Sequence, residues 1–307
     1  MRILVTGGAG FVGRWVVKRL LQENDVWVLD NLSNGQRKNL AEFQGHPHYH
    51  GLQVWDVRDL SLAKGFTQEN LDMVIHMAAQ GNVQQSLDNP VESFQVNVLG
   101  THHVLEAARL NNTKVVFVST CMVYADSDWP IPDDGWTQPS SPYAGTKLAA
   151  ENLALSYYYG LGLPVTILRP FNTYGPFQKT NTEGGVVSIF IKRHLNGQPL
   201  LIYGDGTQSR DLMYVEDCAE FIVRAATNYM AGCLIINAGT GREWSINELA
   251  YIIGGPVEYL PHHHPQAEIQ HVFARTDGMA KRLLGWEAKV SLVEGIRLTE
   301  QWIKEQE

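Results

Sequence analysis

The fold is decided near the N-terminus, by the stretch Arg2-Ile3-Leu4-Val5-Thr6-Gly7-Gly8-Ala9-Gly10-Phe11-Val12-Gly13. Its first residues have the apolar character of a buried strand, and a helical pattern begins at Val12. Gly7, Gly10 and Gly13 therefore stand in the turn between a strand and a helix, where glycine permits a tight turn and lets the backbone approach a pyrophosphate. This position predicts a dinucleotide site at the helix N-terminus.

The residues that follow alternate short apolar runs with helical patterns, as is typical of a parallel sheet covered on both faces. The predicted strands are Ile3–Thr6, Val26–Leu29, Tyr49–Val54, Met73–His76, Val115–Ser119 and Val165–Leu168. The predicted helices between them are Val12–Gln22, Val91–Leu110 and Tyr143–Tyr159. The expected fold class is α/β, a Rossmann-type doubly wound parallel sheet.

After Pro170 the pattern becomes irregular and rich in glycine and proline. We expect residues 170–211 and 239–307 to form a smaller α/β cap that binds the substrate. Such a cap would lie over the carboxyl ends of the strands, where open parallel sheets bind their ligands. Residues 1–169, with a returning segment near 212–238, form the dinucleotide-binding domain in this division.

Composition narrows the class of protein. The 307 residues are 44% hydrophobic and 18% charged, which is ordinary for a globular protein. The net charge of −8 and the lack of a basic block argue against binding to nucleic acid or to an anionic membrane. No apolar run approaches the roughly 20 residues of a membrane span, and no secretory signal precedes the first strand. Cys121, Cys218 and Cys233 fit free thiols, so we expect a cytoplasmic protein.

Asp30 ends the second predicted strand. A carboxylate there accepts hydrogen bonds from the adenosine ribose and repels a 2′-phosphate, which favours NAD over NADP. The alternative is a turn-forming Asp-Asn pair. Arg37 and Lys38 would suit a 2′-phosphate but stand far beyond the strand. Asp56 follows the third strand and is either a partner of the adenine amino group or an ordinary loop carboxylate.

Tyr143 and Lys147 stand one helical turn apart, so both side chains lie on one face of a helix. An ammonium group beside a phenol favours the phenolate and lowers the phenol pKa from its free value of about 10. The pair therefore predicts a general base that works near neutral pH.

Taken together, these motifs resemble the extended short-chain dehydrogenase/reductase family, in its NAD-dependent nucleotide-sugar epimerase/dehydratase branch. The resemblance covers nearly the whole chain. Its carriers are Gly7–Gly13, Asp30-Asn31-Leu32, Asp56-Val57-Arg58, His76-Met77-Ala78-Ala79, Asn97, Ser119-Thr120, Tyr143-x-x-x-Lys147, Arg169–Pro176, Gly204-Asp205-Gly206, Arg210-Asp211, Tyr214–Asp217 and Leu283–Trp286.

The resemblance implies a role for each motif. Tyr143 is the base on the sugar 4-hydroxyl, Lys147 binds the nicotinamide ribose and tunes Tyr143, and Thr120 hydrogen-bonds the reacting oxygen. The residues implied to hold NAD are Gly7, Gly10, Phe11, Val12, Gly13, Asp30, Asn31, Ser33, Asn34, Gly35, Asp56, Val57, Met77, Ala78, Ala79, Gln80, Asn97, Ser119, Tyr143, Lys147 and Pro170. Those implied to bind a nucleotide sugar are Thr120, Tyr143, Phe171, Asn172, Gly185, Val186, Tyr203 on the base and Arg210 on the diphosphate.

The sequence after Thr120 bears on the reaction. In this family, 4,6-dehydratases carry Asp-Glu at this point and decarboxylases usually keep a Glu, whereas here Cys121 and Met122 follow. Neither side chain replaces a carboxylic acid pair, because methionine has no proton to exchange and cysteine is a weak substitute. This absence, and the resemblance of residues 183–187 to epimerases, favours 4-epimerisation of a UDP-hexose or related NDP-sugar. The alternatives are dehydration or decarboxylation with an acid from elsewhere, plain 4-keto reduction, and an NAD-binding regulatory protein.

The sequence departs from the family in one segment. Epimerases often have a second phosphate-binding arginine in an Arg-Pro-Gly-Asp-like run, but residues 261–268 contain none, which leaves His264 and Arg275 as candidates. Three adjacent histidines, 262–264, do not predict a metal site, because neighbours in sequence do not converge on one ion. In this family the helices equivalent to Val91–Leu110 and Tyr143–Tyr159 form a dimer interface, so we expect a homodimer; the alternative is that the chain itself covers both helices.

Overall fold

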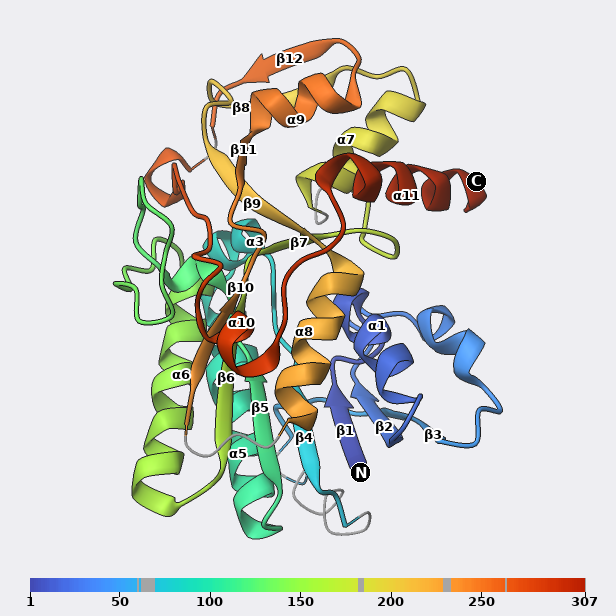
Figure 1. The fold of residues 1–307 in the computed structure, drawn as a ribbon, viewed down its shortest axis with the longest axis vertical. Coiled ribbons are helices and arrows are strands. Elements are labelled where there is room, and N and C mark those ends of the chain that lie inside the picture. The colour runs from blue at the N-terminus through green and yellow to red at the C-terminus, as the bar shows by residue number, and fades with distance from the viewer. Residues whose placement is uncertain (60, 62–69, 182–184, 229–232, 263, 307) are drawn as a thin grey trace.

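The computed structural model describes residues 1–59, 61, 70–181, 185–228, 233–262 and 264–306. Its largest element is a parallel seven-stranded sheet with the order β10-β6-β5-β4-β1-β2-β3 (Figure 1). The strands are β1 (Arg2–Thr6), β2 (Asp25–Asp30), β3 (Tyr49–Val54), β4 (Met73–His76), β5 (Lys114–Val118), β6 (Val165–Pro170) and β10 (Ile235–Ala238). The predicted Rossmann-type α/β class is confirmed, and β10 is a strand that the sequence pattern did not predict.

The strand order reverses beside β1, which pairs with β2 on one side and β4 on the other. Ile3 lies opposite Val26 and Met73 in the two ladders, and all three side chains are fully buried. Burial on both faces explains why these strands read as continuous apolar runs. The reversal places a crevice at the carboxyl ends of β1 and β4, where such sheets bind ligands.

Helices cover both faces of the sheet (Figure 1). On one face α1 (Phe11–Leu20) packs beside α8 (Val215–Thr227), and on the other α5 (Gly100–Leu110) packs beside α6 (Pro142–Leu161). The predicted helix Val91–Leu110 is interrupted: α4 (Pro90–Phe94) passes into a π-helical turn, η2 (Gln95–Leu99), before α5. A π turn often occurs at a functional site, and this one carries Asn97.

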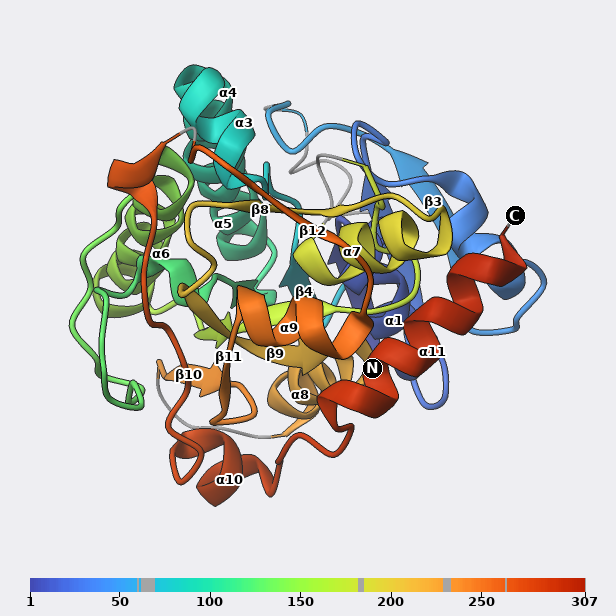
Figure 2. The ribbon, with the colours of Figure 1, turned by 90° about the horizontal axis from the view of Figure 1, so that it is seen from above.

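Most of the remaining elements gather beyond the carboxyl ends of the strands (Figures 1 and 2). One sheet contains β7 (Asn172–Tyr174), β9 (Ser209–Tyr214) and β11 (Glu243–Ser245), and β8 (Leu200–Tyr203) pairs with β12 (Val257–Leu260). The helices among them are α7 (Val186–Leu195), α9 (Ile246–Ile253) and α11 (Leu292–Glu305), whereas α10 (Met279–Leu284) packs beside the large sheet, against β10 and α8. The shorter helices are η1 (Arg37–Phe43), α3 (Val83–Asp88), η3 (Cys121–Val123) and η4 (Pro265–Ala267). The proposed division into two domains stays a prediction.

An aromatic contact joins the loop after β7 to two helices. Phe177 has a φ of 72°, which is unusual for a bulky residue. Its ring centroid lies 6.0 Å from that of Trp15 on α1 and 4.9 Å from that of Trp302 on α11. The indole of Trp15 also donates a hydrogen bond of 3.2 Å to the carbonyl of Pro176. The loop is therefore held from both sides.

None of the helices in the described ranges combines the length and the apolar character that crossing a bilayer requires.

Candidate active site

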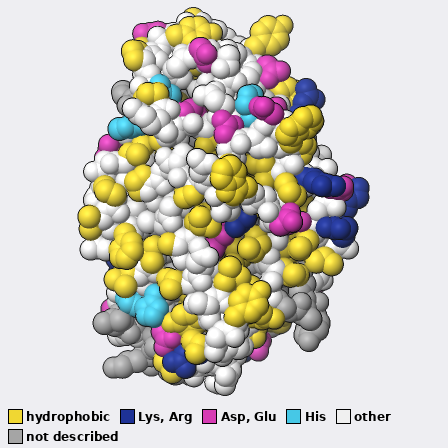
Figure 3. All heavy atoms as spheres, turned by 90° about the vertical axis from the view of Figure 1, so that its left-hand side faces the viewer, with side chains coloured by type: hydrophobic (Ala, Val, Ile, Leu, Met, Phe, Trp, Pro, Cys, Tyr) yellow, Lys and Arg dark blue, Asp and Glu magenta, His cyan; other side chains and the backbone are white. Residues whose placement is uncertain are grey.

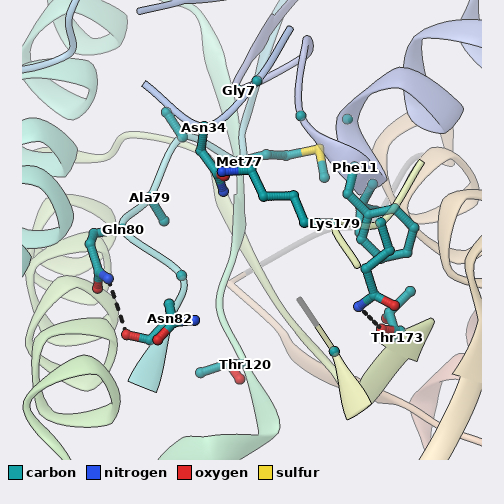
Figure 4. A pocket seen from close by; sticks show the side chains of 18 of the residues that line it. Gly7, Phe11, Asn34, Met77, Ala79, Gln80, Asn82, Thr120, Thr173 and Lys179 are labelled. Atoms are coloured by element: carbon teal, nitrogen blue, oxygen red, sulfur yellow. Dashed lines mark hydrogen bonds between the residues drawn. The ribbon is translucent and has the colours of Figure 1, made fainter. Parts of the chain in front are cut away.

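A cleft of about 1690 Å³ opens at the carboxyl ends of the central strands, beside the switch in strand order. Its lining comes from the glycine loop, from the segments after β2, β4, β5 and β6, and from α11. Figure 4 shows Asn34, Met77 and Lys179 gathered near Gly7, with Gln80, Asn82 and Thr120 farther along the same cavity. The cleft therefore brings together segments that are far apart in sequence.

The glycine loop forms the predicted cradle. Gly7 has a φ of 73°, and its N–H donates to the carbonyl of Leu29 over 2.7 Å. A Cβ added to Gly13 would lie 2.2 Å from the carbonyl oxygen of Gly7, so a side chain there cannot be accommodated. Helix α1 begins at Phe11, and its N-cap Gly10 has no side chain to cap the first N–H groups. Exposed N–H groups at a helix N-terminus suit a phosphate.

Asp30 lies against this cradle. Its carboxylate accepts hydrogen bonds from the N–H groups of Ala9, at 3.0 Å, and Leu32, at 2.8 Å, while burial raises the pKa of the carboxyl. Gly35 packs closely here, because a Cβ on it would lie 2.9 Å from the Asp30 carboxylate. Asn31, Ser33, Asn34 and Gly35 all line the cleft, as predicted. Lys38 lines it too, whereas Arg37 is not among the lining residues.

Asp56 is not among the residues that line the cleft, although the next residue, Val57, is. Hydrogen bonds from Arg58, at 2.7 and 2.9 Å, hold the pKa of the Asp56 carboxyl well below its ordinary range. Asp56 also accepts a hydrogen bond of 2.8 Å from Asn31, so it supports a lining residue.

The segment after β4 forms the floor of the cleft. Met77, Ala78, Ala79 and Gln80 all line it, as predicted. Asn97 does not line the cleft, but its side chain accepts from the Gln80 N–H at 2.8 Å and donates to the Gln80 carbonyl at 3.1 Å. Asn97 therefore acts through Gln80.

The predicted catalytic residues Thr120, Tyr143 and Lys147 meet at one end of the cleft. The Lys147 ammonium donates to the Val118 carbonyl over 2.7 Å, and the Thr120 hydroxyl lies near enough to the Tyr143 phenol to offset part of the effect of burial on the phenol pKa. Burial raises the pKa of Tyr143 to about 12 and lowers that of Lys147 to about 7. The expectation that Lys147 lowers the phenol pKa is therefore wrong for the protein without bound nucleotide. The reason is that burial dominates, while the ammonium is directed to a backbone carbonyl.

Ser119 and Pro170 complete the predicted cofactor-lining set. Among the described residues, none offers a hydrogen-bond partner to the buried Ser119 hydroxyl. A buried polar atom without a partner is costly in a finished site, so this hydroxyl fits a bound group with its own donors and acceptors. Together with the glycine cradle and Asp30, it shows that the residues fit a dinucleotide.

The predicted sugar-binding residues divide into two groups. Phe171, Asn172, Gly185 and Arg210 line the cleft, whereas Val186 and Tyr203 do not. Glu183 and Gly184, cited above for the resemblance to epimerases, lie outside the described residues.

Arg210 already has an anionic partner. Its guanidinium donates to Glu268 and to the Ile269 carbonyl, the latter over 2.7 Å. Glu268 also lies 2.6 Å from His262 Nε2. Residues 261–268, which contain no arginine, thus supply a carboxylate to Arg210.

The two candidates for that missing arginine do not reach the cleft. His264 and Arg275 are absent from its lining, and Arg275 pairs with Asp277 at 2.5 Å.

Lys179 and Lys192 do line the cleft, and the side chain of Lys179 extends toward Met77 and Asn34 (Figure 4). Sequence reasoning missed both lysines, because no motif marks them. The described part of the chain contains no group of three metal-ligating side chains.

A sequence model of the "NAD dependent epimerase/dehydratase family" matches residues 3–239 of the chain. UDP-glucose 4-epimerase of Mycolicibacterium smegmatis is 36% identical over 313 residues, covering 99% of each chain. The crystal structure of Pal from Bacillus thuringiensis is 50% identical, with a TM-score of 0.96 and full coverage of both chains.

A Thermus thermophilus UDP-glucose 4-epimerase solved in complex with NAD is 36% identical, with a TM-score of 0.88 and 99% coverage of both chains. Other relatives are named as UDP-glucuronic acid decarboxylases and as a dTDP-glucose 4,6-dehydratase, so the relatives perform more than one reaction. The chain thus belongs to the NAD-dependent epimerase/dehydratase family, with the Rossmann-type fold and the NAD cofactor of that family.

Proposed function

We propose that the protein is a nucleotide-sugar 4-epimerase that acts on a UDP-hexose through a 4-keto intermediate. One observation supports this most directly. Next to Thr120 and Tyr143 stand Cys121 and Met122, and the carboxylic acids among the described lining residues, Asp30, Asp88, Glu92 and Glu268, come from other segments. A 4-epimerase needs no further carboxylic acid, because the reaction exchanges one proton and Tyr143 both removes and returns it.

In the proposed reaction, Tyr143 takes the proton of the sugar 4-hydroxyl while C4 loses a hydride. When bound, NAD accepts and returns this hydride, and its positively charged ring favours the Tyr143 phenolate. Thr120, which lines the cleft beside Tyr143, orients the reacting oxygen with its hydroxyl. After the keto sugar turns over, C4 regains hydride on its opposite face and Tyr143 returns the proton. Atoms and electrons balance, so no net NADH forms.

Binding of the two ligands is assigned to the two ends of the cleft. The glycine loop, Asp30 and the Met77–Gln80 segment hold NAD, while Phe171, Asn172 and Arg210 hold the nucleotide sugar. We extend the proposal to a cytoplasmic homodimer. Three free cysteines support the compartment, and exposed apolar side chains on α4 and η2 support the dimer.

The reaction can be tested with purified protein and UDP-glucose, UDP-galactose, UDP-glucuronate and the N-acetylated UDP-hexoses. We expect NMR to show interconversion of C4 epimers without accumulation of NADH. A 4-keto-6-deoxy product or a decarboxylated pentose would overturn the epimerase assignment.

Tyr143→Phe tests the assignment of the base. We expect turnover to fall by at least ~100-fold, because the variant has no group to exchange the proton, with NAD affinity nearly unchanged. Tyr159→Phe, on the same helix but 77% exposed, is the matched control and should keep full activity. An NAD-binding regulatory protein would instead show no turnover in either form.

A lyase reaction is the second candidate, because Cys121 lies at the reacting end. Its thiol is 3.7 Å from Asn172 Oδ1, and burial raises its pKa to about 12, so it keeps its proton at neutral pH. A thiol with so high a pKa is a weak acid, so Cys121 would protonate a leaving hydroxyl only slowly and would have to regain its proton before the next turnover. The product analysis above separates this reaction from epimerisation.

A further inference from the structure

A network of hydrogen-bonded, buried polar side chains lies beneath the floor of the cleft. Thr6 on β1, His76 on β4, Asn97 in η2 and Thr101 on α5 are each at most 1% exposed. The proposed reaction uses neither of the two threonines and does not use the histidine. Their hydrogen bonds determine where the hydroxyl protons of the threonines and the ring proton of the histidine lie.

The hydroxyl of Thr101 determines one nitrogen of His76. Thr101 has a single hydroxyl proton, and it donates this proton to the Asn97 carbonyl over 2.6 Å. His76 Nε2 lies 3.0 Å from the same hydroxyl oxygen. Because the Thr101 proton is already committed, the Nε2 atom must carry a hydrogen and donate it.

The hydroxyl of Thr6 determines the other nitrogen. Thr6 Oγ1 accepts hydrogen bonds from the N–H groups of Met77, at 3.1 Å, and Ala78, at 3.2 Å. These fill its acceptor positions, so its own proton points to His76 Nδ1 at 2.7 Å. His76 is therefore neutral and protonated at Nε2 alone. Burial and the nearby Lys147 charge agree, since they lower the pKa of His76 to about 3.

The network contacts the lining of the cleft at both of its ends. At one end, Thr6 holds the N–H groups of Met77 and Ala78. At the other, Asn97 holds the backbone of Gln80 and donates over 3.0 Å to Thr146, whose hydroxyl bonds the Tyr143 carbonyl at 2.9 Å. The same network thus grips the cofactor-lining segment and the first turn of α6.

We infer that Thr6, His76 and Thr101 are positioning residues, which fix the segment Met77–Gln80 relative to Tyr143 through a single histidine tautomer. This inference rests on the proposed function, because it takes the segment to hold NAD beside the base. None of the three residues lines the cleft, so they act through the backbone of the segment that does.

The tautomer can be read by ¹⁵N NMR of histidine-labelled protein. His76, one of 11 histidines, is assigned through His76→Gln, whose spectrum lacks its signals. We expect one protonated and one unprotonated ring nitrogen, with the proton on Nε2 and no titration at neutral pH. A proton on Nδ1, or a ring that titrates near its ordinary pKa of about 6.5, would overturn the inference.

Thr6→Val removes the hydroxyl while keeping the shape of the side chain. We expect the NAD dissociation constant from calorimetry to rise roughly tenfold, because Ala78 N–H and His76 Nδ1 lose a buried partner. Thr6→Ser should restore the affinity to within about threefold, since it returns the hydroxyl. With saturating NAD, kcat should change less than the dissociation constant does.

Thr113→Val is the matched control. Thr113 is also fully buried and its hydroxyl bonds the Leu71 carbonyl, but it precedes β5, at the strand end opposite the cleft. Both valine variants should lose stability, and only Thr6→Val should lose NAD affinity. Equal NAD affinities in the two variants would show a merely structural role. If the unaltered protein failed to bind NAD, the cofactor assignment would fall, whereas the NMR spectrum would still decide on the tautomer.

Discussion

At the scale of single residues, burial sets the protonation of the catalytic pair. The pKa of Tyr143 rises to about 12 and that of Lys147 falls to about 7, because burial disfavours the charged form of each group. The spacing of the two residues was readable in the sequence. Their burial, and the Val118 carbonyl that receives the lysine, were not, because both depend on how β5 and α6 pack.

Lys147 should make the stability of the nucleotide-free protein depend on pH. Its folded pKa of about 7 lies below the ordinary lysine pKa of 10.5, so between these values the unfolded chain binds a proton that the folded chain does not. The free energy of unfolding should therefore rise with pH across this window, relative to Lys147→Met, by on the order of 1 kcal/mol per pH unit.

Urea unfolding at several pH values between 7 and 10 measures this difference. Lys18→Met, which removes a half-exposed lysine from α1, is the matched control. A difference between wild type and Lys147→Met that stays constant over the window would mean that the buried ammonium keeps its proton.

At the scale of elements, the strands were the most predictable part. Each predicted strand of the large sheet is present. All of them except the edge strand β3 are mostly buried, and burial on both faces produces an apolar run in the sequence. The break at η2 was not predictable, since Val91–Leu110 keeps a helical pattern while the π turn depends on the contact between Asn97 and Gln80. The same holds for β10, a short strand whose pairing with β6 is a long-range contact.

The segment after β12 docks onto β9 through Glu268 and Arg210. In the proposed function Arg210 binds the substrate diphosphate, which would then compete with the Glu268 carboxylate for this guanidinium. Glu268→Gln removes the competing charge, so we expect UDP to bind several-fold more tightly in calorimetry, corresponding to about 1 kcal/mol. Glu258→Gln, which removes an exposed carboxylate from β12 outside the cleft, should leave UDP affinity unchanged. Weaker binding by Glu268→Gln would instead show that Glu268 itself contacts the nucleotide.

At the scale of the whole molecule, the described surface leaves apolar side chains uncovered. Val91 is 63% exposed, Phe94 51% and Leu99 41%, all within the α4–η2 stretch. Apolar side chains are also spread over the face on which α6 lies (Figure 3). Clustered exposure of this kind marks an interaction surface, and it supports the homodimer that the family resemblance implies.

Light scattering should give a mass about twice the 34.4 kDa of one chain. Phe94→Glu places a charge in the expected interface and should shift the protein to monomer. Tyr251→Glu, at a residue that is 89% exposed on α9, is the matched control and should leave the dimer intact. A monomeric wild-type protein would refute the dimer.

The contact of Phe177 with Trp302 has a consequence for synthesis. Trp302, Ile303 and Gln306 line the cleft, so one wall of the site comes from a segment that is synthesised after every strand of the large sheet. The large sheet is complete once β10 has emerged, and domains form as their segments become available. A nascent chain can therefore hold its folded sheet while its cleft still lacks the wall that α11 supplies.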